Sequence, residues 1–186
     1  MTGEHGIMAD PLPDILAQGL AVVFCGINPG LSAAAAGHHF VGRGNRFWRV
    51  IHLAGFTPAE ILPRNDRTIL QHRCGLTAVV KRPTARVEQL SAQEFVAAAA
   101  QIEQKITRCA PRFVAFLGKA AYSALSDRRE IAWGYQTAGS QTAAFGGAAV
   151  WVLPNPSGRN RAFSLDQLVS AYRELYQAAN QSQAPT

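Results

Sequence analysis

The chain has 186 residues, of which 48% are hydrophobic and 16% are charged. This size allows one sizeable hydrophobic core and is too small for two typical domains. No apolar run reaches the length of a membrane-spanning helix, and residues 1–6 lack the basic and then apolar pattern of a signal peptide. We therefore expect a cytoplasmic protein with no membrane partner.

The formal net charge of +6 is unevenly distributed along the chain. No acidic residue lies between Asp14 and Glu60, or between Glu130 and Asp166. Several arginines lie within these two stretches, namely Arg43, Arg46, Arg49, Arg159 and Arg161. The planar guanidinium group binds phosphate well, so the stretches predict a positive surface facing a nucleic-acid backbone. Scattered arginines on a solvated surface remain the alternative.

The three cysteines, Cys25, Cys74 and Cys109, are widely spaced and form no CxxC pair. This spacing predicts reduced thiols, neither a disulfide framework nor a metal site. His38 and His39 have no cysteine or carboxylate close by in the sequence, and we expect no metal ligand there.

In chain order, we expect a flexible segment at 1–13, a single domain over 14–179 and a frayed tail at 180–186. Residues 20–27 are almost continuously apolar, which predicts a central strand buried on both faces. Residues 31–44 are rich in Ala, Gly and His and are expected to form a long loop, followed by a helix over 45–53.

Strands and helices alternate in the remainder of the chain. We expect strands at 75–80, 113–117 and 150–153, and a short helix over 118–125. Ser91 with Glu94, and Ser164 with Gln167, have the spacing of capping boxes and predict the starts of two longer helices. The alternation favours an α/β fold with a mainly parallel sheet covered by helices on both faces.

An apolar run that ends in Asn-Pro and a glycine occurs twice, over residues 22–30 and 150–158. Proline holds the preceding asparagine in an extended conformation, so both Asn28 and Asn155 should follow strand ends. The carboxyl ends of parallel strands line the binding crevice of such folds. Either asparagine could instead be a simple turn former.

The residue types around these loops restrict the chemistry. The glycine spacing matches neither a dinucleotide fingerprint nor a phosphate-binding loop. Cys25 as a nucleophile with a histidine base is disfavoured, because it lies within a strand. An asparagine amide cannot act as a general base, but it can orient a water molecule. This suits a reaction with a good leaving group, such as a nucleobase leaving deoxyribose, with Phe40 stacked on an extruded base.

Five motifs, in order, are Gly26-Ile27-Asn28-Pro29-Gly30, Gly44-Asn45-Arg46-Phe47-Trp48, Cys74-Gly75-Leu76-Thr77, Leu117-Gly118-Lys119 and Leu153-Pro154-Asn155-Pro156-Ser157-Gly158. With them, the chain resembles the bacterial mismatch-specific uracil-DNA glycosylases, relatives of the thymine-DNA glycosylases, over about residues 14–178. The resemblance implies a three-layer α/β/α sandwich and no cofactor. It also implies that uracil or 3,N4-ethenocytosine opposite guanine is flipped out of double-stranded DNA and removed by hydrolysis, which leaves an abasic site. We expect a monomer.

The resemblance also implies the roles of individual residues. It makes Asn28 and Asn155 catalytic, with Asn28 orienting the attacking water. It assigns contacts with the base to Gly26, Ile27, Ser32 and Phe40. It assigns contacts with DNA to Arg43, Asn45, Lys119, Gly158, Arg159, Asn160 and Arg161. The last four of these would form a loop that enters the duplex.

Two positions depart from the family pattern and leave specificity open. Arg159 and Ala78 stand where enterobacterial members have leucine and lysine, so the preference for the opposite base is not fixed by the sequence. The nearest carboxylates along the chain, Asp14 and Asp66, remain alternative activators of water. The ranking of uracil, ethenocytosine, thymine, xanthine and hypoxanthine, and activity on single-stranded DNA, also remain open.

Two other functions remain as alternatives. A non-catalytic protein could bind DNA lesions in the same basic crevice. A small-molecule nucleoside hydrolase is disfavoured, because such enzymes generally use acidic groups that these loops lack.

Overall fold

The computed structural model describes residues 11–126, 128, 130–138 and 141–181. Its centre is a sheet in which the strands lie in the order β2-β1-β3-β8-β4, with β7 also paired to β8. The parallel strands are β1 (Val22–Gly26), β2 (Cys74–Ala78), β3 (Phe113–Leu117) and β8 (Ala148–Leu153). The short strands β4 (Gly134–Tyr135) and β7 (Ala144–Phe145) run antiparallel to β8, and β5 (Thr137–Ala138) pairs with β6 (Gln141–Thr142).

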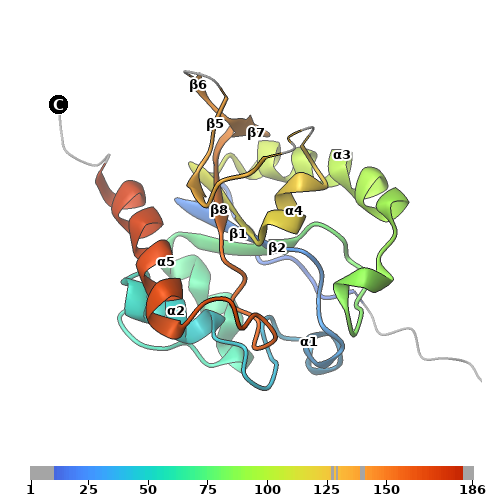
Figure 1. The fold of residues 1–186 in the computed structure, drawn as a ribbon. Coiled ribbons are helices and arrows are strands. Elements are labelled where there is room, and N and C mark those ends of the chain that lie inside the picture. The colour runs from blue at the N-terminus through green and yellow to red at the C-terminus, as the bar shows by residue number, and fades with distance from the viewer. Residues whose placement is uncertain (1–10, 127, 129, 139–140, 182–186) are drawn as a thin grey trace, which may run out of the picture.

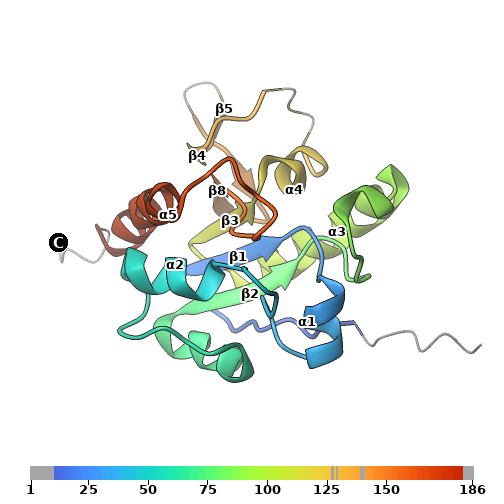
Figure 2. The same ribbon diagram turned by 60° about the horizontal axis from the view of Figure 1, so that its bottom comes forward.

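Helices cover both faces of this sheet (Figures 1 and 2). One face carries α2 (Phe47–Ala54) and α5 (Leu165–Asn180), and the other carries α3 (Ala92–Cys109) and α4 (Lys119–Ser123). Successive residues of β1 face opposite sides: Phe24 packs in the cluster of α2 and α5, whereas Val23 packs with α3 and α4. The predicted three-layer α/β/α sandwich with a mainly parallel sheet is therefore confirmed, and β1 is central.

Both predicted capping boxes are present. The Ser91 hydroxyl accepts from the backbone N–H of Glu94, and the Ser164 hydroxyl accepts from that of Gln167. Each hydrogen bond satisfies an amide that the first turn of a helix leaves without a partner. The starts of α3 and α5 therefore follow directly from local sequence.

The predicted loop over 31–44 is wrong in its first half, where α1 (Leu31–Ala36) forms. Four consecutive alanines at 33–36 favour a helix, and Gly37 ends it with a positive φ of 70°. The sequence analysis also missed two 3₁₀ segments, η1 (Pro63–His72) and η2 (Val87–Gln89). η2 has only three residues, and η1 is mostly polar and buries only Asp66 and Ile69, so neither has the apolar content that predicts a packed helix.

Residues 1–10 of the expected flexible segment and 182–186 of the expected tail lie outside the described residues. Leu12 is buried, and Asn180 still belongs to α5. In the part of the chain that the structure describes, no helix combines the length and the apolar character needed to cross a membrane.

Candidate functional site

A cleft with a volume of about 630 Å³ opens at the carboxyl ends of the parallel strands. Its walls come from the loops after β1 and β8, from residues 39–45 and from residues 84–87. Thr77 and Ala78 of β2 and Leu117 of β3 complete it. Among the described residues that line the cleft there is no aspartate, glutamate or lysine, whereas Arg43, Arg86 and Arg159 all line it. The two Asn-Pro loops therefore meet in one positive, carboxylate-free cleft.

The side chain of Asn28 is held in one orientation. Its Nδ2 donates to the carbonyl oxygen of Arg82 at 2.9 Å and to the hydroxyl oxygen of Thr84 at 2.8 Å. The Thr84 hydroxyl donates its own hydrogen to the Arg86 carbonyl at 2.8 Å, so it can only accept from Asn28. Because both partners require a donor, the amide nitrogen points to them. Oδ1 is left as the atom of Asn28 that can accept a hydrogen bond in the cleft.

The loop that holds Asn28 is itself fastened to α3. The guanidinium group of Arg82 donates to both carboxylate oxygens of Glu94, at 2.6 and 3.0 Å, and to the carbonyl oxygen of Gln89 at 2.8 Å. The hydrogen bond from Arg82 and that from the backbone of Ser91 lower the pKa of Glu94 to about 2. The ion pair thus persists through the whole neutral and mildly acidic range.

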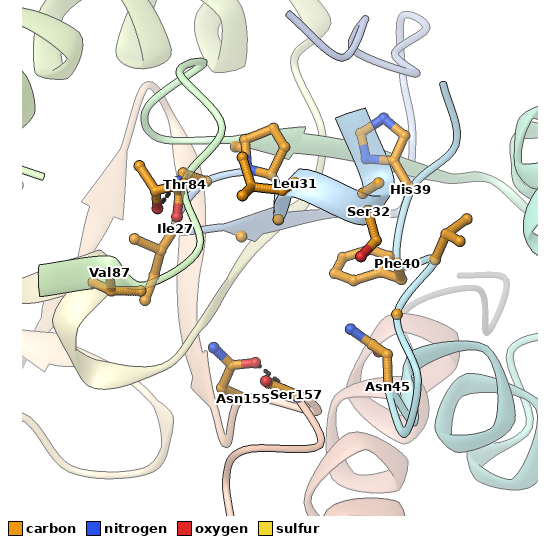
Figure 3. Close-up of a pocket in the computed structure, with 18 of the residues that line it drawn as sticks. Ile27, Leu31, Ser32, His39, Phe40, Asn45, Thr84, Val87, Asn155 and Ser157 are labelled. Atoms are coloured by element: carbon orange, nitrogen blue, oxygen red, sulfur yellow. Dashed lines mark hydrogen bonds between the residues drawn. The ribbon is translucent and has the colours of Figure 1, made fainter. Parts of the chain in front are cut away.

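Asn155 is oriented by the loop that it begins. Its Oδ1 accepts from the backbone N–H of Ser157 at 2.9 Å, and its carbonyl oxygen accepts from Asn160 Nδ2 at 2.8 Å. In Figure 3 the amide nitrogens of Asn155 and Asn45 both point toward the open space between Ile27 and Phe40. Asn155 therefore presents a donor to the cleft, whereas Asn28 presents an acceptor.

Phe40 forms an aromatic wall of the cleft. Its ring stacks on Phe47, with the ring centroids 3.9 Å apart and an angle of 21° between the planes. Its backbone has a positive φ of 56°, a conformation that costs a non-glycine residue energy and persists only where the surroundings impose it. The ring is half-buried and lines the cleft beside Ser32 (Figure 3).

Hydrogen bonds hold His39, the residue directly before Phe40, in place. Its backbone N–H donates to Asp66 Oδ2 at 2.9 Å, its Nε2 lies 2.8 Å from the carbonyl oxygen of Pro13, and its carbonyl oxygen accepts from Trp48 Nε1 at 3.1 Å. A carbonyl can only accept, so Nε2 carries the hydrogen. Burial lowers the pKa of His39 below its ordinary value, which keeps the ring neutral.

Residues 156–163 form a second loop at the mouth of the cleft. The backbones of Gly158 and Gly44 touch: a Cβ at residue 158 would lie 2.7 Å from the Gly44 carbonyl oxygen. Arg159 Nη1 donates across the mouth to the carbonyl oxygen of Ala85 at 2.9 Å. The motifs around residues 44 and 158, far apart in sequence, thus form one side of the cleft.

A family model described as the uracil DNA glycosylase superfamily matches residues 13–179. The chain belongs to the uracil DNA glycosylase superfamily. Its fold is also similar to the solution structure of a candidate uracil DNA glycosylase from Methanosarcina acetivorans. That comparison has a TM-score of 0.58 at 21% identity and covers 90% of this chain and 98% of the other.

The structure brings most of the predicted site residues of this superfamily member to the cleft. Those that line it are Gly26, Ile27, Asn28, Ser32, Phe40, Arg43, Asn45, Asn155, Gly158 and Arg159. Asn160 and the exposed Arg161 belong to the same loop as Gly158 but do not line the cleft. Lys119 is also outside it, with its ammonium group 4.8 Å from the centre of the Trp133 ring. Their predicted DNA contacts stay predictions.

The structure bears on three other points of the sequence analysis, of which the prediction for Cys25 is confirmed. Arg46 does not contribute to a positive rim, because its guanidinium group donates to loop carbonyl oxygens. Asp14 and Asp66 do not line the cleft: Asp14 is paired with Lys105 at 2.7 Å, and Asp66 is buried. Cys25 is fully buried, and this burial raises the pKa of its thiol, so it cannot supply a thiolate nucleophile.

Two residues that matter to the site were missed. Thr84 and His39 both line the cleft, and each also forms hydrogen bonds there, Thr84 with Asn28 and His39 with Asp66. Neither belongs to a periodic pattern, and Thr84 contacts a residue that precedes it by 56 positions. The sole signal was that Thr84 follows Arg82-Pro83, a rigid dipeptide close after a strand. Among the described residues, no group of three or more His, Cys, Asp or Glu side chains is placed to hold a metal ion.

Proposed function

We propose that the protein is a monofunctional DNA glycosylase that removes uracil or 3,N4-ethenocytosine mispaired with guanine from double-stranded DNA. The observation that carries the proposal is the amide of Asn28, whose Nδ2 is held by two acceptors so that Oδ1 is left as the acceptor in a positive cleft with no carboxylate among its described lining residues. Membership of the superfamily supports the same activity.

In the proposed reaction, a flipped nucleotide places its base against Phe40 and its sugar near Asn28. The bond between C1′ and the base nitrogen breaks, and its electron pair leaves with the base. Oδ1 of Asn28 accepts a hydrogen bond from a water molecule and directs the water oxygen toward C1′. The new C–O bond forms there, and the water proton is lost to solvent or to the departing base, which leaves an abasic site.

Other groups of the cleft act on the base. Asn155 Nδ2 is a donor that can stabilise the negative charge developing on the leaving base. Phe40 offers a stacking surface, while Ser32 and the backbones of Gly26, Ile27 and Phe40 can contact the base edge. These contacts select a planar pyrimidine-like base and hold it in the extruded position.

The absence of lysine among the described lining residues favours hydrolysis over a Schiff-base mechanism. On the DNA side, Arg43, Asn45 and Lys119 would contact the strand, and residues 158–161 would enter the duplex and face the unpaired guanine. A single chain supplies every group in this proposal, so we propose a monomer that acts on cytoplasmic DNA.

The test is base release under single-turnover conditions from a duplex with one uracil opposite guanine. Asn28→Ala should lower the rate by about a hundredfold or more, the scale of a lost positioning or electrostatic group. Asn180→Ala is the matched control, because its amide donates to the Tyr176 carbonyl within α5, and Asn180 is not among the described residues that line the cleft. Duplexes with uracil opposite adenine and ethenocytosine opposite guanine define the specificity.

Each outcome decides a different part of the proposal. If the wild type releases the base and Asn28→Ala releases it equally fast, the glycosylase activity is supported and the role of Asn28 is contradicted. Tight binding of the mismatch without base release from any of these duplexes would establish a lesion-binding protein instead. Equal release opposite adenine and guanine would contradict the mismatch preference.

A further inference from the structure

The backbone of the loop at 156–163 is shaped by a side chain from elsewhere in the chain. Four carbonyl oxygens of the loop turn inward and accept hydrogen bonds from the one guanidinium group of Arg46. The distances are 3.4 Å from Nε to Pro156, 3.2 and 2.8 Å from Nη2 to Ser157 and Asn160, and 2.8 Å from Nη1 to Phe163. The backbone N–H of Arg46 also donates to the Pro156 carbonyl, at 3.0 Å.

Only arginine has the geometry for this arrangement. Carbonyl dipoles that converge on one point repel each other unless a cation with several donors lies between them. The guanidinium group has five N–H donors in a rigid plane, whereas a lysine ammonium group concentrates three donors at a single atom. Arg46 also directly precedes α2, which packs against the sheet. Its hydrogen bonds therefore fix the position of the loop relative to this helix.

Two further contacts hold the loop at 156–163 against the rest of the domain. Gly158 has an ordinary negative φ, yet a Cβ there would meet the Gly44 carbonyl oxygen at 2.7 Å, so the close approach itself requires glycine. The buried hydroxyl of Tyr172 donates to the carbonyl oxygen of Pro154 at 3.0 Å and fixes the chain just before the loop. The loop leaves the side chain of Arg161 exposed and places Arg159 so that its guanidinium group reaches across the mouth of the cleft to the Ala85 carbonyl oxygen.

We propose that Arg46 is the positioning residue that preforms this loop for insertion into DNA, a proposal that rests on the function proposed above. Arg46 is not among the described residues that line the cleft. Its loss therefore leaves Asn28 in place, held by Arg82 and Thr84, and changes the cleft only where the loop itself lines or supports it. Loss of Arg46 removes the preformed conformation of the loop. The loop can then no longer recognise the gap that the flipped nucleotide leaves in the duplex, or the unpaired guanine opposite it.

The first test compares Arg46→Lys with the wild type and with Arg173→Lys. Arg173 is a matched control, because its guanidinium group donates to the carbonyl oxygen of Leu53, remote in sequence from the loop. Binding is measured to a duplex carrying a tetrahydrofuran abasic-site analogue opposite guanine and to an undamaged duplex. Arg46→Lys should lower the ratio of the two affinities by about tenfold, the effect of one lost base contact, with little change for undamaged DNA. Arg173→Lys should keep the wild-type ratio.

Hydrogen exchange provides a readout of the loop itself. Amides of residues 157–163 should exchange faster in Arg46→Lys, while those of β1 and β3 keep the wild-type rate. Gly158→Ala disrupts the same loop with Arg46 intact and should lower the affinity ratio as well, which keeps the test valid if Arg46→Lys fails to fold. An unchanged ratio and unchanged exchange in a folded Arg46→Lys protein would overturn the proposal.

The two proposals can fail separately. If the wild type releases no base, the proposed glycosylase activity fails, but the affinity ratio and the exchange rates still decide the role of Arg46. If Arg46→Lys lowers base release as strongly as Asn28→Ala while the affinity ratio is unchanged, Arg46 acts on the chemical step and the positioning role is contradicted.

Discussion

The ring of Phe40 lies flat on the ring of Phe47, with centroids 3.9 Å apart, and so joins a wall of the cleft to the core beneath α2. Phe47 in turn meets Phe24 of β1 edge to face, at 5.3 Å. The stacking surface offered to a base is therefore the outer layer of an aromatic column that begins in the central strand.

Phe40→Leu removes this surface and keeps an apolar side chain at the same strained backbone position. We expect base release to slow by about tenfold, because stacking of a base on an aromatic ring contributes ~1–3 kcal/mol. The free energy of unfolding should fall by ~0.5–1.5 kcal/mol through loss of the contact with Phe47. Single-turnover rates and urea titrations measure both. Phe95→Leu, on α3, should lower stability alone, and an equal loss of rate in that variant would contradict the role of Phe40.

Thr84→Val tests the orientation of Asn28. Valine has nearly the shape of threonine but offers no hydroxyl, so Asn28 Nδ2 keeps only the Arg82 carbonyl as a partner. We expect the rate of base release at saturating enzyme to fall by at least about tenfold, since small displacements of a positioning group carry such penalties. Thr84→Ser retains the hydroxyl and should retain the rate. If valine and serine behave alike, the hydroxyl does not orient Asn28.

Glu94→Gln tests the ion pair that fastens the loop of Arg82. Glutamine can still complete the capping box at Ser91 but has no charge for Arg82. Because the folded protein lowers the pKa of Glu94 from 4.5 to about 2, the carboxylate stabilises the fold above pH 4.5, and this contribution is lost as the pH falls toward 2. Urea titrations of both proteins should differ most at neutral pH and converge toward pH 2. A difference that stays constant with pH would contradict the ion pair.

His39→Gln tests the neutral buried ring beside Phe40. Burial lowers the pKa of folded His39 below the ordinary 6.5, so the unfolded chain binds a proton first as the pH falls. The wild type should therefore lose stability below about pH 6.5. Glutamine can still donate to the Pro13 carbonyl but does not titrate, so His39→Gln should show a weaker pH dependence. A pH dependence of His39→Gln equal to that of the wild type would contradict the role of the buried ring.

The framework of the fold was predictable because it depends on local rules. Continuous apolar runs identified β1 and β3 as buried strands, and paired residues such as Ser91 and Glu94 identified helix starts. The two asparagines were found because proline and glycine mark the ends of the strands that precede them. Each of these patterns can be recognised from neighbouring residues alone, without the contacts that form between distant parts of the chain.

The supports of the cleft were not predictable in the same way. Thr84 holds Asn28 across 56 positions, and Arg46 bonds to Asn160 across 114. Such contacts exist only after the sheet has brought the loops together, and single residues of this kind leave no periodic pattern in the sequence. The arginine content predicted a positive surface, but it did not separate Arg46, which organises a loop, from Arg43 and Arg159, which line the cleft.

The position of β8 in the sheet has a consequence for synthesis of the protein. β1 pairs with β2 and β3, but β3 obtains its second neighbour only when residues 148–153 have been made. Until then a nascent chain displays an open strand edge, which favours pairing with other chains. It also lacks Asn155, Ser157, Gly158 and Arg159, so a fragment that ends before this strand has no residue from that side of the cleft.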